Sequence, residues 1–291
     1  MKDKKHIILV PTDFTEVGNS AIEYAISFSK VTGFGIAILH VIEKPLIRIG
    51  GDKTFDNKII QEGTIMRLEQ NAKLIKEKHN IDVEIIAKPG NIFDTINDVA
   101  EEIDANLVIM GTHGVKGIQR FVGSNALRVI YDSEIPFIVV QNKVVESQYN
   151  DIVVPIDFRR ESKEKIVWSI YIAQKFNAKI HLLYPTEKDP LIKKNLIANL
   201  AYTQNLLEKN NVEFVIKASD KDSEDLADET IKYAKEVKSN LIVIMTYPKE
   251  GSGGAAEFFL TPDQQNMITN KAQIPVMCIN PRKTYISYSK V

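Results

Sequence analysis

The sequence lacks the features that define several common protein classes. It has one cysteine in 291 residues, so no disulfide framework can form within the chain. No run of about 18 apolar residues occurs, and the apolar stretch after Met1–His6 is too short for a secretory signal, which predicts a cytoplasmic protein with no membrane partner. Lys and Arg total 37 against 38 Asp and Glu, so no overall positive field exists to attract nucleic acid.

Catalytic signatures are also missing. The chain has no Gly-Lys-Ser/Thr phosphate loop, no Gly-x-Ser-x-Gly elbow and no His-Glu-x-x-His pair. Its five histidines show no spacing typical of a zinc site. The single Cys278 lies in an apolar run, where we expect it to be buried rather than reactive. The common hydrolase, transferase and metal-centre constellations are therefore excluded.

What the chain does contain is an internal repeat. Its length and 44% hydrophobic content are typical of about two folded domains. The segment ending in Pro11-Thr-Asp13-Phe recurs as one ending in Pro155-Ile-Asp157-Phe, 144 residues later. Two later segments recur in the same order, at 106–110 and 240–245 and at 134–140 and 273–279. A whole domain is therefore duplicated.

Each copy alternates short β-branched runs with stretches of helical periodicity. Ala21, Tyr24, Ala25 and Phe28 share one helical face, so this helix should pack on a sheet. Strands made almost entirely of Val, Ile and Leu are covered on both faces, which is typical of parallel sheets. We expect strands at 6–10, 35–42, 83–88, 106–110 and 137–141, then at 151–155, 179–184, 213–217, 240–246 and 276–280. Helices are expected at 66–79, 92–103 and 124–133.

The polar stretch 142–150 divides the chain into domains at 1–143 and 150–283. Because this linker is short, we expect the two domains to pack as a pseudo-dimer within one chain, with a homodimer of chains as a further option. Residues 43–63 contain Gly50-Gly51 and many polar side chains, so they are expected to form an irregular lid after the second strand.

Two segments of the first copy should meet at one edge of its sheet. Ligands of open parallel sheets bind beyond the carboxyl ends of the strands. The first strand ends at Pro11-Thr12-Asp13, and the fourth ends at Met110. The chain then reads Gly111-Thr-His113-Gly114 and, further on, Gly123-Ser124-Asn125 before a helix. Glycines let a backbone approach an anion, and free N–H groups at a helix start point towards it, so this segment suits a polyphosphate.

These motifs resemble those of the universal stress protein family. In that family a Gly-x2-Gly-x9-Gly-Ser/Thr signature after the fourth strand holds ATP phosphates, whereas this chain has Gly111-x2-Gly114-x8-Gly123-Ser124, one residue fewer. Pro11-Thr12-Asp13-Phe14 and Leu39-His40-Val41 also match the family pattern.

The resemblance covers nearly the whole chain. It implies two Rossmann-like, adenine nucleotide α-hydrolase-like α/β domains, each with a five-stranded parallel sheet. It also implies adenine near Asp13 and Val41 and phosphates at Gly111, Gly114, Gly123 and Ser124. The full set of nucleotide-site candidates is Pro11, Thr12, Asp13, Val41, Met110, Gly111, His113, Gly114, Gly123, Ser124 and Asn125.

Individual side chains in this set have competing roles. In one interpretation Asp13 is a metal ligand or a catalytic acid. In the favoured interpretation it caps the following turn or binds the ribose or adenine group. His113 contacts phosphate or only shapes its turn, and Ser124 is an N-cap or a phosphate ligand. Lys116 and Arg120 place two cations in the same segment.

The second copy departs further from the family pattern. Aligning the Ile-Pro pairs places Pro262-Asp263 opposite Gly123-Ser124, and aligning the fourth strands places Thr246 opposite Gly111. Proline has no N–H to donate, and a carboxylate repels phosphate. Tyr184 also replaces His40. The nucleotide cradle should therefore be lost in this copy.

Three functions follow as hypotheses. The leading one is a regulatory protein, not an enzyme, whose ATP occupancy in the first domain is read by an unknown protein partner. The second is an interaction module of the same fold that binds no nucleotide, since the glycine motif is one residue short. The third is a slow ATPase, which would usually need Mg²⁺ and for which only Asp13 and the Ser124 hydroxyl are available.

Overall fold

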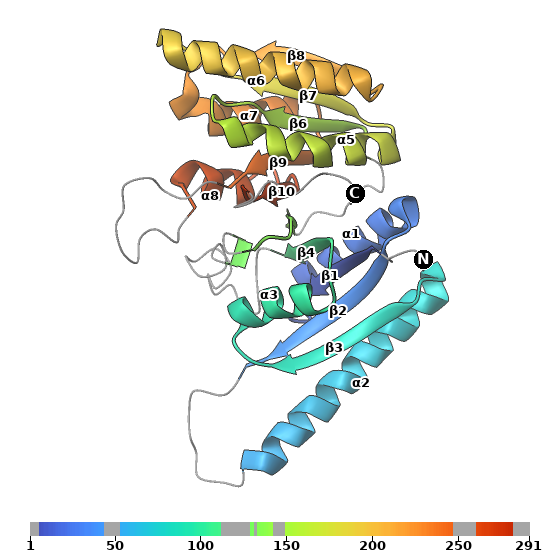
Figure 1. Ribbon diagram of the computed structural model, residues 1–291. Coiled ribbons are helices and arrows are strands. Elements are labelled where there is room, and N and C mark those ends of the chain that lie inside the picture. The colour runs from blue at the N-terminus through green and yellow to red at the C-terminus, as the bar shows by residue number, and fades with distance from the viewer. Residues whose placement is uncertain are drawn as a thin grey trace. The chain divides into compact units, whose positions relative to one another are not determined.

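A computed structural model of the chain describes residues 6–43, 53–111, 129–130, 133–141, 149–246 and 260–281. The chain divides into two compact units, unit 1 (Met1–Val145) and unit 2 (Glu146–Val291). Each unit has the parallel α/β architecture that the sequence predicts (Figure 1). None of the helices in the described ranges is long and apolar enough to cross a bilayer.

Unit 1 alternates strands with helices along the chain. Its described elements are β1 (Ile7–Pro11), α1 (Glu16–Thr32), β2 (Gly35–Ile42), α2 (Lys53–His79), β3 (Val83–Pro89), α3 (Ile92–Glu102), β4 (Leu107–Gly111) and β5 (Phe137–Val140). The strands pair in parallel in the order β3-β2-β1-β4-β5. The winding direction reverses between β1 and β4, and a doubly wound sheet opens its ligand crevice at such a point.

The core of unit 1 lies between the sheet and its helices. The four side chains assigned from sequence to one face of α1 are all buried, which confirms that this helix packs on the sheet. The Thr15 side chain caps α1 by accepting from Gly18 N at 3.2 Å. At its other end Gly33 adopts φ 78°, the left-handed conformation that ends many helices and that glycine adopts without strain.

The predicted lid is wrong for most of its length. Residues 53–63 are helical and form the start of α2, which runs along β3 (Figure 1). Ile59 and Ile60 in this first part of α2 are half exposed. The sequence there lacks the periodic apolar face by which an amphipathic helix is recognised. Residues 44–52 lie outside the described part of the chain.

Unit 2 repeats this plan. Its described elements are β6 (Asp151–Pro155), η2 (Arg160–Lys163), α5 (Glu164–Phe176), β7 (Lys179–Tyr184), α6 (Pro190–Lys209), β8 (Phe214–Ala218), η3 (Ser223–Asp225), α7 (Leu226–Glu236), β9 (Leu241–Met245), α8 (Pro262–Ile268) and β10 (Val276–Ile279). The strands are parallel in the order β8-β7-β6-β9-β10, which repeats the winding of unit 1. Cys278 in β10 is 2% exposed, as expected, and burial raises the pKa of its thiol.

Strand register corrects one alignment made from sequence. Ile8 of β1 pairs with Leu107 of β4, and the equivalent Ile152 of β6 pairs with Leu241 of β9. Counting along each strand from these pairs places Met245, and not Thr246, opposite Gly111. The apolar run after Asn240 is one residue longer than the run after Asn106, so side-chain type alone misaligned the two strand ends.

Candidate functional site

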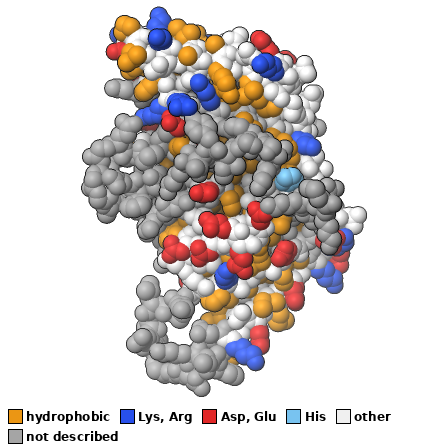
Figure 2. Space-filling view, viewed as in Figure 1, with side chains coloured by type: hydrophobic (Ala, Val, Ile, Leu, Met, Phe, Trp, Pro, Cys, Tyr) orange, Lys and Arg blue, Asp and Glu red, His pale blue; other side chains and the backbone are white. Residues whose placement is uncertain are grey.

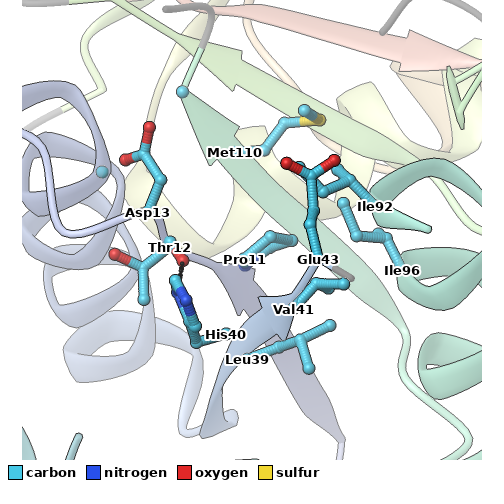
Figure 3. A pocket seen from close by; sticks show the side chains of 12 residues that line it. Pro11, Thr12, Asp13, Leu39, His40, Val41, Glu43, Ile92, Ile96 and Met110 are labelled. Atoms are coloured by element: carbon cyan, nitrogen blue, oxygen red, sulfur yellow. Dashed lines mark hydrogen bonds between the residues drawn. The ribbon is translucent and has the colours of Figure 1, made fainter. Parts of the chain in front are cut away.

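A pocket of about 260 Å³ opens in unit 1 at the carboxyl ends of β1, β2 and β4 (Figure 3). Six residues that the sequence predicts for the site line it, namely Pro11, Thr12, Asp13, Val41, Met110 and Gly111. The other six lining residues were not among the site candidates, although two of them belong to the family motif Leu39-His40-Val41; the six are Gly18, Leu39, His40, Glu43, Ile92 and Ile96. Chain segments up to about 100 residues apart therefore meet where the parallel sheet predicts.

Asp13 is held in place by the start of α1. Its Oδ1 accepts hydrogen bonds from Thr15 N at 3.0 Å and from Thr15 Oγ1 at 2.5 Å. This is the turn-capping role expected of an aspartate at a strand end. Neither bond uses Oδ2, and Figure 3 shows the carboxylate beside the pocket. Asp13 thus has an oriented oxygen left to accept from a ligand.

His40 joins the ends of β1 and β2. Its Nδ1 donates to the Thr12 carbonyl oxygen at 2.8 Å, and this contact is drawn as the dashed line in Figure 3. A carbonyl can only accept, so the proton lies on Nδ1, and Nε2 of the neutral ring is an acceptor. Thr12 N donates in turn to Leu39 O at 2.8 Å. The strand ends that line the pocket are therefore fixed before any ligand arrives.

Phe14, the residue after Asp13, adopts φ 62°. A bulky side chain in the left-handed region is strained and persists only where its surroundings hold it. Here its ring stacks on His40 with 4.6 Å between ring centroids, and the Arg67 guanidinium of α2 lies 4.2 Å from its centre. The equivalent Phe158 of unit 2 has no positive φ.

Glycine at position 111 is required by close packing. A Cβ built on Gly111 would lie 2.5 Å from Val17 Cγ1 and 3.0 Å from Val17 O, closer than real Cβ contacts. Gly18 is similarly close to the pocket, since its Cβ would lie 3.0 Å from Thr12 Oγ1 and 3.1 Å from Asp13 Oδ1. These glycines let the first turn of α1 approach the ends of β1 and β4.

The opposite wall combines apolar and acidic side chains. Ile92 and Ile96 come from the first turns of α3, and Figure 3 shows Glu43 and Asp13 with their carboxylates on opposite sides of the pocket. Asp94, Asp98, Glu101 and Glu102 of α3 are exposed, and acidic side chains gather over this helix in Figure 2. The described lining contains no Lys or Arg. It is therefore suited to hydrogen-bond donors and apolar rings rather than to phosphate.

The remaining predicted site residues are His113, Gly114, Gly123, Ser124 and Asn125. They lie outside the described residues, as do Lys116 and Arg120. Their role in a nucleotide site stays a prediction. Within the described ranges, no group of three or more His, Cys, Asp or Glu side chains is arranged to hold a metal ion.

In unit 2 the corresponding strand ends line a second pocket, of about 280 Å³. Pro155 and Asp157 occupy the places of Pro11 and Asp13, and Met245 brings a side chain where unit 1 has Gly111. The helix α8 begins at Pro262, and Thr261 caps it in a reciprocal pair with Gln264. Asp263 lines this pocket, and burial together with Asp228 and Asp225 raises its pKa. The two pockets thus share a location but not a chemistry.

Comparisons with known proteins agree with this architecture. The model of the universal stress protein family matches residues 5–141 and, again, residues 148–280. Universal stress protein MJ0531 of Methanocaldococcus jannaschii is 26% identical over 138 residues, covering 46% of this chain and 81% of that protein. Universal stress protein MJ0577 of the same organism is 26% identical over 153 residues, covering 47% and 94%.

A solved structure extends the likeness of fold to the full chain. The crystal structure of a universal stress protein from Archaeoglobus fulgidus has a TM-score of 0.75 and 19% identity, covering 95% of this chain and 97% of that one. With the family model matched twice, in the two halves that the repeat defines, the chain belongs to the universal stress protein family as a tandem member.

Proposed function

We propose that unit 1 binds an adenine nucleotide, ATP, and that its occupancy is read by a protein partner in the cytoplasm. The observation that carries the proposal is the meeting of Pro11, Thr12, Asp13, Val41, Met110 and Gly111 at one pocket. The family resemblance implies ATP at these same positions.

The described lining suits the adenosine part of the ligand. Val41, Ile92 and Ile96 offer apolar surface for a flat base. Asp13 Oδ2 and the Glu43 carboxylate accept from hydroxyl and amino groups, which adenosine supplies and phosphate does not. The phosphates would extend towards residues 112–128, where the glycine motif and two cations follow Gly111 in the sequence.

We infer a binding protein rather than an enzyme. Asp13, one of the two acids that line the pocket, is already engaged with Thr15 in a turn. An acid held in this way positions a ligand. The other titratable side chains in the described lining are His40 and Glu43. His40 is tied to Thr12 O. Any ATP hydrolysis, with Mg²⁺ as the accompanying ion, should be slow.

A second candidate is a protein-interaction module without nucleotide. The eight-residue spacing between Gly114 and Gly123 favours it, because a shorter segment changes where a triphosphate could be held. The intrachain pseudo-dimer and a homodimer of chains remain predictions under either function.

Native mass spectrometry of the purified protein separates the two functions. We expect the mass of one adenine nucleotide per chain, or its appearance when ATP is added, and a calorimetric titration with one site per chain. Asp157→Ala is the matched control, since it removes the equivalent carboxylate of unit 2. No bound nucleotide at millimolar ATP would support the interaction module, and two equivalent sites per chain would contradict the assignment to unit 1.

A further inference from the structure

The pocket of unit 2 contains a side chain that no nucleotide role explains. Lys165 lies in the first turn of α5 and lines the pocket, yet it is only 2% exposed. The equivalent residue of unit 1, 144 positions earlier, is the fully buried Ala21. Unit 2 has therefore placed an ammonium group where unit 1 has a methyl group.

This ammonium has no hydrogen bond or ion pair with any residue that the structure describes. Asp157, the carboxylate that acts on its charge, is already engaged, because its Oδ1 accepts from Arg159 N at 3.0 Å and its Oδ2 lies 3.8 Å from Arg159 Nη1. A buried charge is costly unless a partner compensates it. The cost is visible in the pKa of Lys165, which burial lowers to about 8 although Asp157 acts in the opposite direction.

Apolar side chains form about half of the lining of this pocket. Ile244 and Met245 at the end of β9, Met267 of α8 and Leu226 of α7 line the same pocket. A cavity of about 150 Å³ holds a benzene molecule, so about 280 Å³ has room for a ligand of roughly eight to ten non-hydrogen atoms.

We propose that the pocket of unit 2 binds a small organic carboxylate, whose headgroup pairs with Lys165 and whose apolar tail packs against Ile244, Met245 and Met267. A charged partner in this buried place supplies the hydrogen bonds that the described residues do not. The site is separate from the nucleotide pocket and does not depend on it.

The charge of the lining favours a single negative charge over a phosphate. Asp157 and Asp263 line the pocket together with Lys165 and Arg159, and Arg159 is paired with Asp157. A phosphate ester would bring up to two negative charges next to two carboxylates, whereas a carboxylate needs one cation. The short α8 begins with a proline and its cap is already filled by Thr261, so it adds no anion site.

Methionine methyl groups report the two pockets separately. Of the six methionines in the sequence, Met110 lines the pocket of unit 1, and Met245 and Met267 line that of unit 2. The protein is labelled with ¹³C at the methionine methyl groups and titrated with hexanoate, with 1-hexanol and with hexylamine. We expect hexanoate to shift Met245 and Met267 but not Met110, and to bind about tenfold or more tightly than the alcohol.

Two lysine variants complete the test. Lys165→Met should lose the preference for hexanoate over hexanol, and Lys165→Arg should keep it. Lys179→Met is the matched control, because Lys179 is partly exposed and paired with Glu213 at 2.7 Å outside this pocket. Unchanged Met110 and Met277 resonances show that each variant is folded. Absence of hexanoate binding, equal binding of hexanoate and hexanol, or an unaffected preference in Lys165→Met would overturn the proposal.

Discussion

The two units keep the same strands and differ where those strands end. Through β1 and β2 the equivalent residues of β6 and β7 follow at a constant offset, and the pairing Ile7 with Gly35 is repeated by Asp151 with Lys179. At the pocket, Gly18 becomes Ser162 and Ala21 becomes Lys165. Gly111 becomes Met245. After a duplication, the two copies can thus keep the same sheet while the side chains that line their pockets change.

The first turn of the helix after the first strand shows how the change is accommodated. In unit 1 it is α-helical and lies against Gly111, where a side chain would meet Val17. In unit 2 the same stretch is the 3₁₀ helix Arg160–Lys163, and Met245 carries a full side chain. Ser162 fills the place of Gly18, and its oxygen accepts from Asp157 N at 3.4 Å. At this position, unit 1 brings the helix close to the strand end at Gly111, whereas unit 2 fills the space with the side chain of Met245.

Lys165 is the difference between the two units with the largest expected effect on stability. Burial lowers the pKa of Lys165 from its usual 10.5 to about 8 in the folded protein, so the destabilisation is fully present below pH 8 and is lost as pH rises to 10.5. Lys165→Met should therefore stabilise unit 2 at pH 7 by on the order of 3 kcal/mol and by little at pH 10.5. Ala21→Lys should destabilise unit 1. Urea denaturation in carboxylate-free buffer, followed by the fluorescence of Trp168 for unit 2, measures the first effect. A Lys165→Met protein less stable at pH 7 would contradict it.

ATP should stabilise one unit and not the other. At about a hundred times its dissociation constant it should add roughly 2.7 kcal/mol to unit 1 and raise its melting temperature by about 5–10 °C. Gly123→Val should abolish this rise, since a β-branched side chain would stand where the glycine motif admits phosphate, whereas a change at Pro262 should not. Scanning calorimetry with and without ATP gives both shifts. A rise that survives in Gly123→Val would remove the glycine motif from the site.

Gly111→Ala tests close packing in unit 1. The added Cβ meets Val17, so we expect a loss of about 1–3 kcal/mol in the free energy of unfolding. Gly63→Ala in α2 is the control, since nothing lies within 4 Å of its Cβ position and alanine favours a helix by about 1 kcal/mol. The denaturation midpoint should fall in Gly111→Ala and rise in Gly63→Ala. A Gly111→Ala midpoint that does not fall would show that Val17 adjusts freely.

The smallest effect is expected at Asp13. Asp13→Ala should weaken ATP binding several-fold, or on the order of 1 kcal/mol, while Asp157→Ala leaves it unchanged. Calorimetric titration of the two variants measures both affinities. Equal affinity in wild type and Asp13→Ala would exclude this carboxylate from the nucleotide site.

Sequence was sufficient for the strands and for half of the described pocket. Runs of Val, Ile and Leu mark buried parallel strands directly, and every described strand end falls within one residue of its predicted bound. The start of α2 was missed because its apolar side chains do not share a buried face. Ile92 and Ile96 have the i, i+4 spacing that could have placed them on one side of α3, but the position of Glu43 depends on how the chain leaves β2. The sequence did not show that Met245 is the equivalent of Gly111, because strand register is set by hydrogen bonds rather than by residue type.

The strained Phe14 connects the pocket of unit 1 to α2, none of whose described side chains lines that pocket. Its backbone follows Asp13, while its ring is held between His40 and Arg67 of α2. A left-handed conformation of this kind costs about 1–3 kcal/mol, and the two ring contacts are what accompany it here. Any ligand contact made by Asp13 is therefore one residue away from a direct contact with α2.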